Sequence, residues 1–117
     1  MRILIAGGRD FNDAKVMQYT LSGISSTSTE VVISGGANGA DKLGEEWARG
    51  RSIPVERYPA LWKEHGRAAG PIRNQQMLDE GKPDLVVVFP GGEGSQSMVR
   101  KARKAGVTTL TPRWTVL

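Results

Sequence analysis

Three glycine-rich segments carry the residues of this chain whose types and spacing suit chemistry. They read Ile5-Ala6-Gly7-Gly8-Arg9-Asp10, Ser34-Gly35-Gly36-Ala37-Asn38-Gly39-Ala40-Asp41 and Pro90-Gly91-Gly92-Glu93-Gly94-Ser95. Each follows a short apolar run and precedes a segment with helical periodicity. Glycine lets a ligand approach the main chain, and the unpaired N–H groups at a helix start favour phosphate. The three turns together predict a site for a nucleotide or a nucleotide-like ligand.

The expected phosphate cradle consists mainly of backbone N–H groups in the second and third turns. The Ser34 hydroxyl is a further donor, and Ser95 either caps a helix or binds phosphate, two roles that can coexist. The alternative for each turn is a tight strand–helix connection without a ligand. The full set of candidate ligand-binding residues is Gly7, Gly8, Arg9, Ser34, Gly35, Gly36, Asn38, Gly39, Asp41, Arg73, Asn74, Gly91, Gly92, Gly94 and Ser95.

Two arginines are expected to neutralise the phosphate charge. Arg9 follows the first turn, and Arg73 begins a predicted helix, so both side chains should face the same edge of the sheet. A guanidinium binds phosphate through two parallel hydrogen bonds. The alternatives are a surface ion pair of Arg9 with Asp10 or Asp13, and a helix-start pair of Arg73 with Asn74. If Asn74 does not pair with Arg73, its amide is expected to hydrogen-bond the sugar or the base of the ligand.

No catalytic residue is assigned, although three carboxylates are candidates for an acid or a base: Asp41, Asp10 and Glu93. Asp41 has two further interpretations, contact with a ribose hydroxyl or stabilisation of a helix N-terminus. His65 is the only histidine and there is no cysteine, so neither a metal site nor a nucleophilic triad can be assembled. We expect no metal and no cofactor.

Composition indicates a folded domain without membrane segments. The 117 residues suffice for one domain, 1–117, with residues 111–117 as a tail, and 38 % are hydrophobic. The absence of cysteine and of a signal-peptide pattern favours a cytoplasmic location. The net charge of +4 would suit nucleic acid, but no aromatic residue interleaves the basic cluster Arg100-Lys101 and Arg103-Lys104. A nucleic-acid partner is therefore the less favoured one.

The elements that must position these residues alternate strictly between β and α. The expected strands are Arg2–Ala6, Val31–Ser34, Val55–Tyr58, Leu85–Phe89 and Val107–Leu110. The expected helices are about Asp13–Ser25, Gly39–Gly50, Pro71–Gly81 and Ser95–Ala105, with Pro59–Gly70 as a long connection. This alternation predicts an α/β fold with a parallel five-stranded sheet in the order 3-2-1-4-5. The first and third turns would flank the switch point between strands one and four.

Four motifs in order resemble the SLOG superfamily, and in particular its short, stand-alone YspA-type family. They are the first turn extended to Phe11, the second and third turns, and Gly66-Arg67-Ala68-Ala69-Gly70-Pro71-Ile72-Arg73-Asn74-Gln75-Gln76-Met77. The superfamily includes the DprA proteins and the LONELY GUY phosphoribohydrolases. The resemblance covers about residues 1 to 110. It implies a Rossmann-like three-layer sandwich with a pocket for nucleotides or nucleotide-derived signals.

The third turn departs from the phosphoribohydrolase pattern Pro-Gly-Gly-x-Gly-Thr-x-x-Glu. Met98 stands at the position of the catalytic glutamate, and a thioether cannot act as an acid or a base. Asn74 stands where those enzymes have lysine. The leading hypothesis is therefore binding, that is sensing or sequestering, of a nucleotide or an ADP-ribose-like metabolite. The alternatives are hydrolysis of an N-glycosidic or phosphodiester bond, and DprA-like binding of single-stranded nucleic acid.

SLOG relatives often pair through helix faces, so a homo-oligomer is possible. Trp47 and Trp62 are candidate contacts, although core packing suits Trp47 better. Trp114 in the tail is expected to pack back on the domain.

Overall fold

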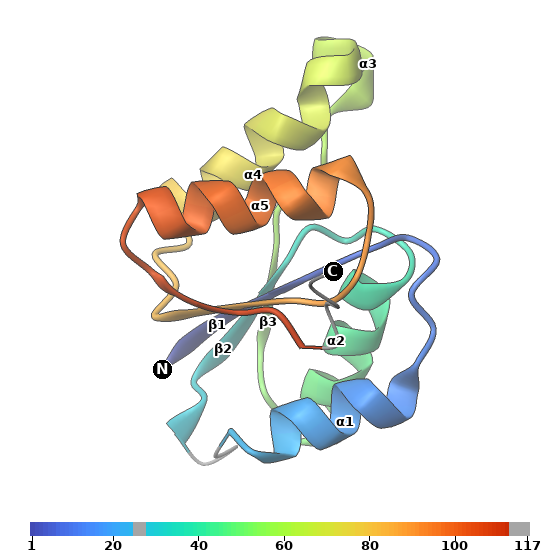
Figure 1. Cartoon of the computed structure of the whole chain (residues 1–117), viewed down its shortest axis with the longest axis vertical. Coiled ribbons are helices and arrows are strands. Elements are labelled where there is room, and N and C mark those ends of the chain that lie inside the picture. Colours follow the sequence, from blue (N-terminus) through green and yellow to red (C-terminus); the bar gives the residue numbers. More distant parts are fainter. Residues whose placement is uncertain (25–27, 113–117) are drawn as a thin grey trace, which may run out of the picture.

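The computed structural model describes residues 1–24 and 28–112. Strands and helices alternate along the chain (Figure 1). In chain order the elements are β1 Arg2–Ala6, α1 Ala14–Ser22, β2 Val31–Ser34, α2 Ala40–Gly50, β3 Val55–Arg57, α3 Trp62–His65, the 3-10 turn η2 Gly66–Ala68, α4 Ala69–Asp79, β4 Leu85–Val88, α5 Glu93–Lys104 and β5 Thr108–Leu110. Trp114 and its expected packing lie outside the described residues.

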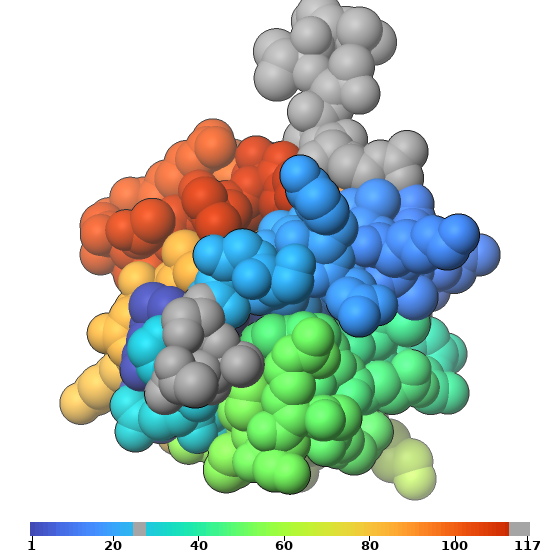
Figure 2. All heavy atoms as spheres, turned by 90° about the horizontal axis from the view of Figure 1, so that it is seen from below, coloured from blue at the N-terminus to red at the C-terminus, as the bar shows by residue number. Residues whose placement is uncertain are grey.

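The sheet has five parallel strands in the order β3-β2-β1-β4-β5, which confirms the predicted fold class and strand order. The central strand β1 pairs Ile3 with Val32 of β2 on one side and with Leu85 of β4 on the other. Helices α1 and α2 lie on one face of the sheet and α4 and α5 on the other (Figure 1). This arrangement gives three layers, and α1 and α2 lie side by side when the molecule is seen from below (Figure 2).

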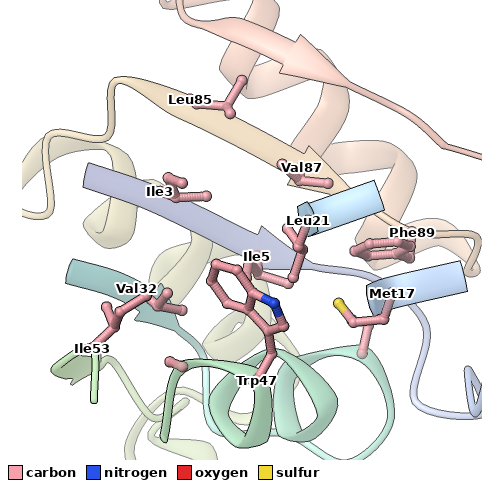
Figure 3. Close-up of a cluster of buried hydrophobic side chains, with 12 residues drawn as sticks. Ile3, Ile5, Met17, Leu21, Val32, Trp47, Ile53, Leu85, Val87 and Phe89 are labelled. Atoms are coloured by element: carbon pink, nitrogen blue, oxygen red, sulfur yellow. The ribbon is translucent and has the colours of Figure 1, made fainter. Parts of the chain in front are cut away.

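Each face of the sheet carries its own hydrophobic core, because successive side chains of a strand point to opposite faces. Figure 3 shows the core under α1 and α2, where Met17, Leu21 and Trp47 pack over the strands. The other core joins Leu4 and its neighbours on the strands to α4 and α5, through Met77, Leu78, Met98, Val99 and Ala102. Burial on both faces explains why the central strands read as continuous apolar runs. Trp47 therefore belongs to the core.

Several element boundaries differ from the expected ones. The connection after β3 is not a plain loop, because it contains α3 and η2. Helix α4 begins at Ala69, so Pro71 is its third residue and not its first. Helix α5 begins at Glu93 with Gly92 as N-cap, so Ser95 does not cap it. An acidic residue in the first turn is favoured by the helix dipole, which is consistent with the earlier start at Glu93.

None of the described helices is both long enough and apolar enough to cross a bilayer.

Candidate functional site

A cleft of about 410 Å³ opens at the edge of the sheet where the parallel strands end. It lies between the first and third turns on one side and α3 and α4 on the other. The predicted residues that line it are Gly7, Gly8, Arg9, Asp41, Arg73, Asn74, Gly92, Gly94 and Ser95, together with the catalytic candidate Asp10. Gly91 lines an adjacent, more open hollow of about 650 Å³, which also includes Gly8, Arg9, Asp10 and Gly92.

Three of the predicted glycines pack the turns against one another. A Cβ added at Gly8 would lie 2.8 Å from both the Gly91 Cα and the Pro90 oxygen. Gly39 has φ +78°, and a Cβ there would collide with the carbonyl oxygens of Gly8 and Arg9. The N–H of Ala40 donates to the Gly8 oxygen at 3.1 Å. Glycine at positions 8, 39 and 91 therefore lets the first turn touch the second and the third.

Two other glycines face open space at the start of α5. Among the described residues, no atom lies within 4 Å of a Cβ added at Gly92 or at Gly94. The N-cap of this helix is Gly92, and within the described part of the chain no side chain caps it. Ser95, in the first turn of α5, is buried and lines the cleft. The N-terminus of a twelve-residue helix thus opens onto the cleft, which is a favourable position for an anion.

Arg73 connects α4 to the second turn. Its Nη1 donates to the Gly35 oxygen at 2.9 Å, and its Nε donates to Asn74 Oδ1 at 2.9 Å. A side chain at Gly35 would collide with this guanidinium. Burial lowers the pKa of Arg73, while the charge of Asp41 raises it and that of Arg9 lowers it. Asn74 in turn donates from Nδ2 to the Gly94 oxygen at 3.4 Å. Gly35 and Asn74 thereby fix the direction of the arginine fork.

Asp41 is the buried acid of the cleft, with 6 % of its surface exposed. Its Oδ2 accepts a hydrogen bond from the N–H of Ala37 at 3.2 Å. Burial raises the pKa of Asp41 to about 6, against the hydrogen bond from Ala37 and the charge of Arg73, both of which lower it. Asp41 therefore changes its charge close to neutral pH.

The other two catalytic candidates are exposed. Asp10 lines the cleft, whereas Glu93 does not and pairs with Arg100 at 2.8 Å. Met98, at the position of the phosphoribohydrolase glutamate, is buried and lines the cleft. The described part of the chain contains no group of three or more His, Cys, Asp or Glu residues placed to hold a metal ion.

Five predicted residues lie outside both hollows: Ser34, Gly35, Gly36, Asn38 and Gly39. The Ser34 side chain is fully buried and its hydroxyl donates to Glu45 Oε2 at 2.6 Å, so its proton points away from the cleft. The same oxygen accepts from the N–H of Gly36 at 3.1 Å. The first part of the second turn is thus held by contacts within the protein.

Sequence reasoning missed Glu45, which is only 1 % exposed. Besides Ser34, it accepts hydrogen bonds from Arg57 Nε at 3.0 Å and from Arg49 Nη2 at 3.1 Å. Burial alone raises the pKa of Glu45, but hydrogen bonds from Arg57 and Ser34 outweigh it and hold the pKa below its ordinary value. The signal in the sequence was an acid four residues after Asp41, beside the apolar inner face of α2.

The sequence also gave no reason to place Trp62 in the site. It begins α3, lines the cleft and remains 48 % exposed. The guanidinium carbon of Arg9 lies 5.4 Å from the centre of the indole ring, which is a cation–π distance. The contact spans more than fifty residues of chain and depends on α3, which the sequence did not reveal. The expectation that Trp62 contributes to an oligomer contact stays a prediction.

Two comparisons with known protein sequences identify the family of this chain. Residues 1–65 match the YspA, cpYpsA-related SLOG family. The Gene 61 protein of Mycobacterium phage D29 is 34 % identical to this chain over an alignment of 118 residues. The alignment covers 93 % of this chain and 94 % of the phage protein. The similarity to the phage protein therefore extends well beyond residue 65, into the part that carries α4 and α5. Taken with the sheet order and the glycine turns, these matches show that the chain belongs to the YspA, cpYpsA-related SLOG family.

Proposed function

We propose that this protein binds a nucleotide or a nucleotide-derived phosphate ligand in the cleft and acts as a sensor or a sequestering protein. Membership of the SLOG family suggests a nucleotide-related binding role. The observation that carries the proposal is the presence of two arginines, Arg9 and Arg73, in one cleft with the open N-terminus of α5. Opposite charge and unpaired N–H groups together form an anion site.

The phosphate is expected at the start of α5. Gly92 and Gly94 leave space for oxygen atoms to approach the main chain, and Ser95 adds a hydroxyl close by. Arg73 is held by Gly35 and Asn74, so little conformational freedom is lost when it binds an anion.

The remainder of the ligand is expected along α4 and the start of α2. In its charged form, Asp41 accepts hydrogen bonds and suits ribose hydroxyls. The volume of about 410 Å³ lies within the range of roughly 300–1,000 Å³ that is typical of small-molecule pockets. A longer, ADP-ribose-like ligand would extend past Arg9 into the adjacent hollow, since the two hollows share Gly8, Arg9, Asp10 and Gly92.

Thermal-shift and calorimetric titrations with AMP, ADP-ribose, cyclic AMP and a short single-stranded DNA test the proposal. A ligand at a hundred times its dissociation constant stabilises the fold by about 2.7 kcal/mol, which is readily measured. We expect at least one nucleotide to bind and the DNA not to compete with it. Stabilisation by the DNA alone, weakening steeply with salt, would favour the nucleic-acid alternative instead.

A pair of glycine variants locates the site. Gly94→Leu places a side chain in the cleft, whereas Gly50→Leu adds one to the last turn of α2, outside the cleft; both positions have free space around an added Cβ. We expect both variants to fold and only Gly94→Leu to lose nucleotide binding. Full binding by a folded Gly94→Leu variant would place the ligand elsewhere.

Hydrolysis of a nucleotide N-glycosidic or phosphodiester bond is the second candidate function. The observation that favours it is Asp41, because burial raises the pKa of this cleft carboxyl to about 6, a value suited to an acid or a base at neutral pH. Mass spectrometry of each nucleotide after incubation tests it. Conversion by the natural protein that is lost in Asp41→Asn would establish an enzyme, and an intact ligand would support binding alone.

A further inference from the structure

The aromatic surface in the cleft points to the kind of ligand that fits there. Trp62 exposes about half of its surface although it is a large aromatic side chain. It lies on α3, which projects beyond the N-terminal end of α4 and away from the sheet (Figure 1). A cleft with a cationic, N–H-rich end and an aromatic wall suits a molecule that carries both a phosphate and an aromatic ring.

Two neighbours lie beside the indole. Its benzo edge lies near the start of α4, where a Cβ added at Gly70 would be 3.6 Å from Trp62 Cη2. The guanidinium of Arg9 covers the ring at 5.4 Å. Arg9 itself is exposed, and a cation–π contact at an exposed site is weak. Arg9 can therefore leave the ring for a phosphate, to which a guanidinium forms stronger charge-assisted hydrogen bonds.

We propose that Trp62 recognises an aromatic base: the base of the ligand stacks on the indole, and Arg9 turns from the indole to the phosphate. This inference rests on the proposed function and specifies its ligand as a nucleotide with its base attached, in preference to a sugar phosphate. Stacking on an aromatic side chain tolerates every base, because each has a π-face. Discrimination between bases then falls to the polar groups of the cleft, among them Asn74.

Calorimetric titration with AMP, GMP, CMP, UMP and ribose 5-phosphate tests the inference. For the nucleotide that the natural protein binds best, the dissociation constant should be lower than that of ribose 5-phosphate by a factor of about ten or more. Trp62→Leu should weaken binding of that nucleotide about tenfold and change the affinity for ribose 5-phosphate by less than about twofold. Trp62→Phe should keep most of the affinity for the nucleotide, because its ring can still stack on the base. Leu61→Ala is the matched control, since Leu61 is equally exposed but does not line the cleft.

A fluorescence titration gives a second readout. The bound base should quench tryptophan emission in the natural protein and not in Trp62→Phe, which keeps the other two tryptophans, Trp47 and Trp114. Equal affinities for nucleotide and ribose 5-phosphate, or equal weakening of both by Trp62→Leu, would overturn the base-stacking inference and leave the phosphate site intact. Binding of none of these five probes, nor of ADP-ribose or cyclic AMP, would overturn the proposed function and this inference together.

Discussion

The hydroxyl of Ser34 donates a 2.6 Å hydrogen bond to the buried carboxylate of Glu45 and so joins the end of β2 to the middle of α2. The N–H of Gly36 donates to the same hydroxyl oxygen at 3.1 Å. The chain that leaves β2 is thereby held against the helix that carries Asp41, one turn before Glu45. This buried pair fixes the second turn, although neither residue lines the cleft.

Replacement of Glu45 by alanine should destabilise the fold by about 2–3 kcal/mol, because the Ser34 hydroxyl loses its acceptor and two arginines lose their partner. Urea unfolding measures the loss. Glu46→Ala, on the exposed side of the same helix, should stay within about 0.5 kcal/mol of the natural protein. Equal stabilities of the two variants would contradict a structural role for the buried carboxylate.

The Asp41→Asn variant should be more stable than the natural protein at pH 7.5, and this advantage should shrink by about 2 kcal/mol at pH 4.5. Burial raises the pKa of Asp41 in the folded chain to about 6, above 3.8. The stability that Asp41 contributes is therefore present below pH 3.8 and is lost as the pH rises through about 6. Urea unfolding at both pH values measures it, and a constant difference between the two proteins would exclude the raised pKa.

The Gly8→Ala variant should lose about 1–3 kcal/mol of stability, because the new Cβ would lie 2.8 Å from backbone atoms of Pro90 and Gly91. Gly94→Ala should be unchanged or gain up to about 1 kcal/mol, since it replaces a helical glycine with free space around it. Thermal unfolding of both variants checks this contrast. A Gly8→Ala protein as stable as the natural one would show that the first and third turns can separate at little cost.

The Arg73→Met variant should weaken binding of AMP and of ribose 5-phosphate by the same factor, about tenfold or more, because both ligands carry the phosphate. This differs from Trp62→Leu, which should weaken binding of the nucleotide and leave that of ribose 5-phosphate nearly unchanged. Arg67→Met is the control, since Arg67 is exposed in η2 and does not line the cleft. Calorimetry on folded variants measures the ratios. A loss confined to AMP would indicate that Arg73 contacts the base and not the phosphate.

The sequence predicted the fold because local patterns specify it. Short apolar runs marked the central strands β1, β2 and β4, helical periodicity marked every α-helix except α3, and strict alternation implied the parallel sheet. The same alternation brings the glycine turns to one edge of the sheet, and Arg9, Asp41, Arg73 and Ser95 line one cleft there; their binding of a ligand stays a prediction.

Only the tertiary structure decided what each residue touches. Glycine is needed at positions 8 and 39 because the turns contact one another there, whereas Gly92 and Gly94 face open space. The sequence shows the same residue type at all four positions and does not distinguish these two roles. The burial of Glu45 and the contact of Arg9 with Trp62 depend on residues brought together from separate elements. Local sequence determines backbone conformation and hydrophobic pattern; burial, charge state and contact partners follow from packing between distant segments, which no local pattern contains.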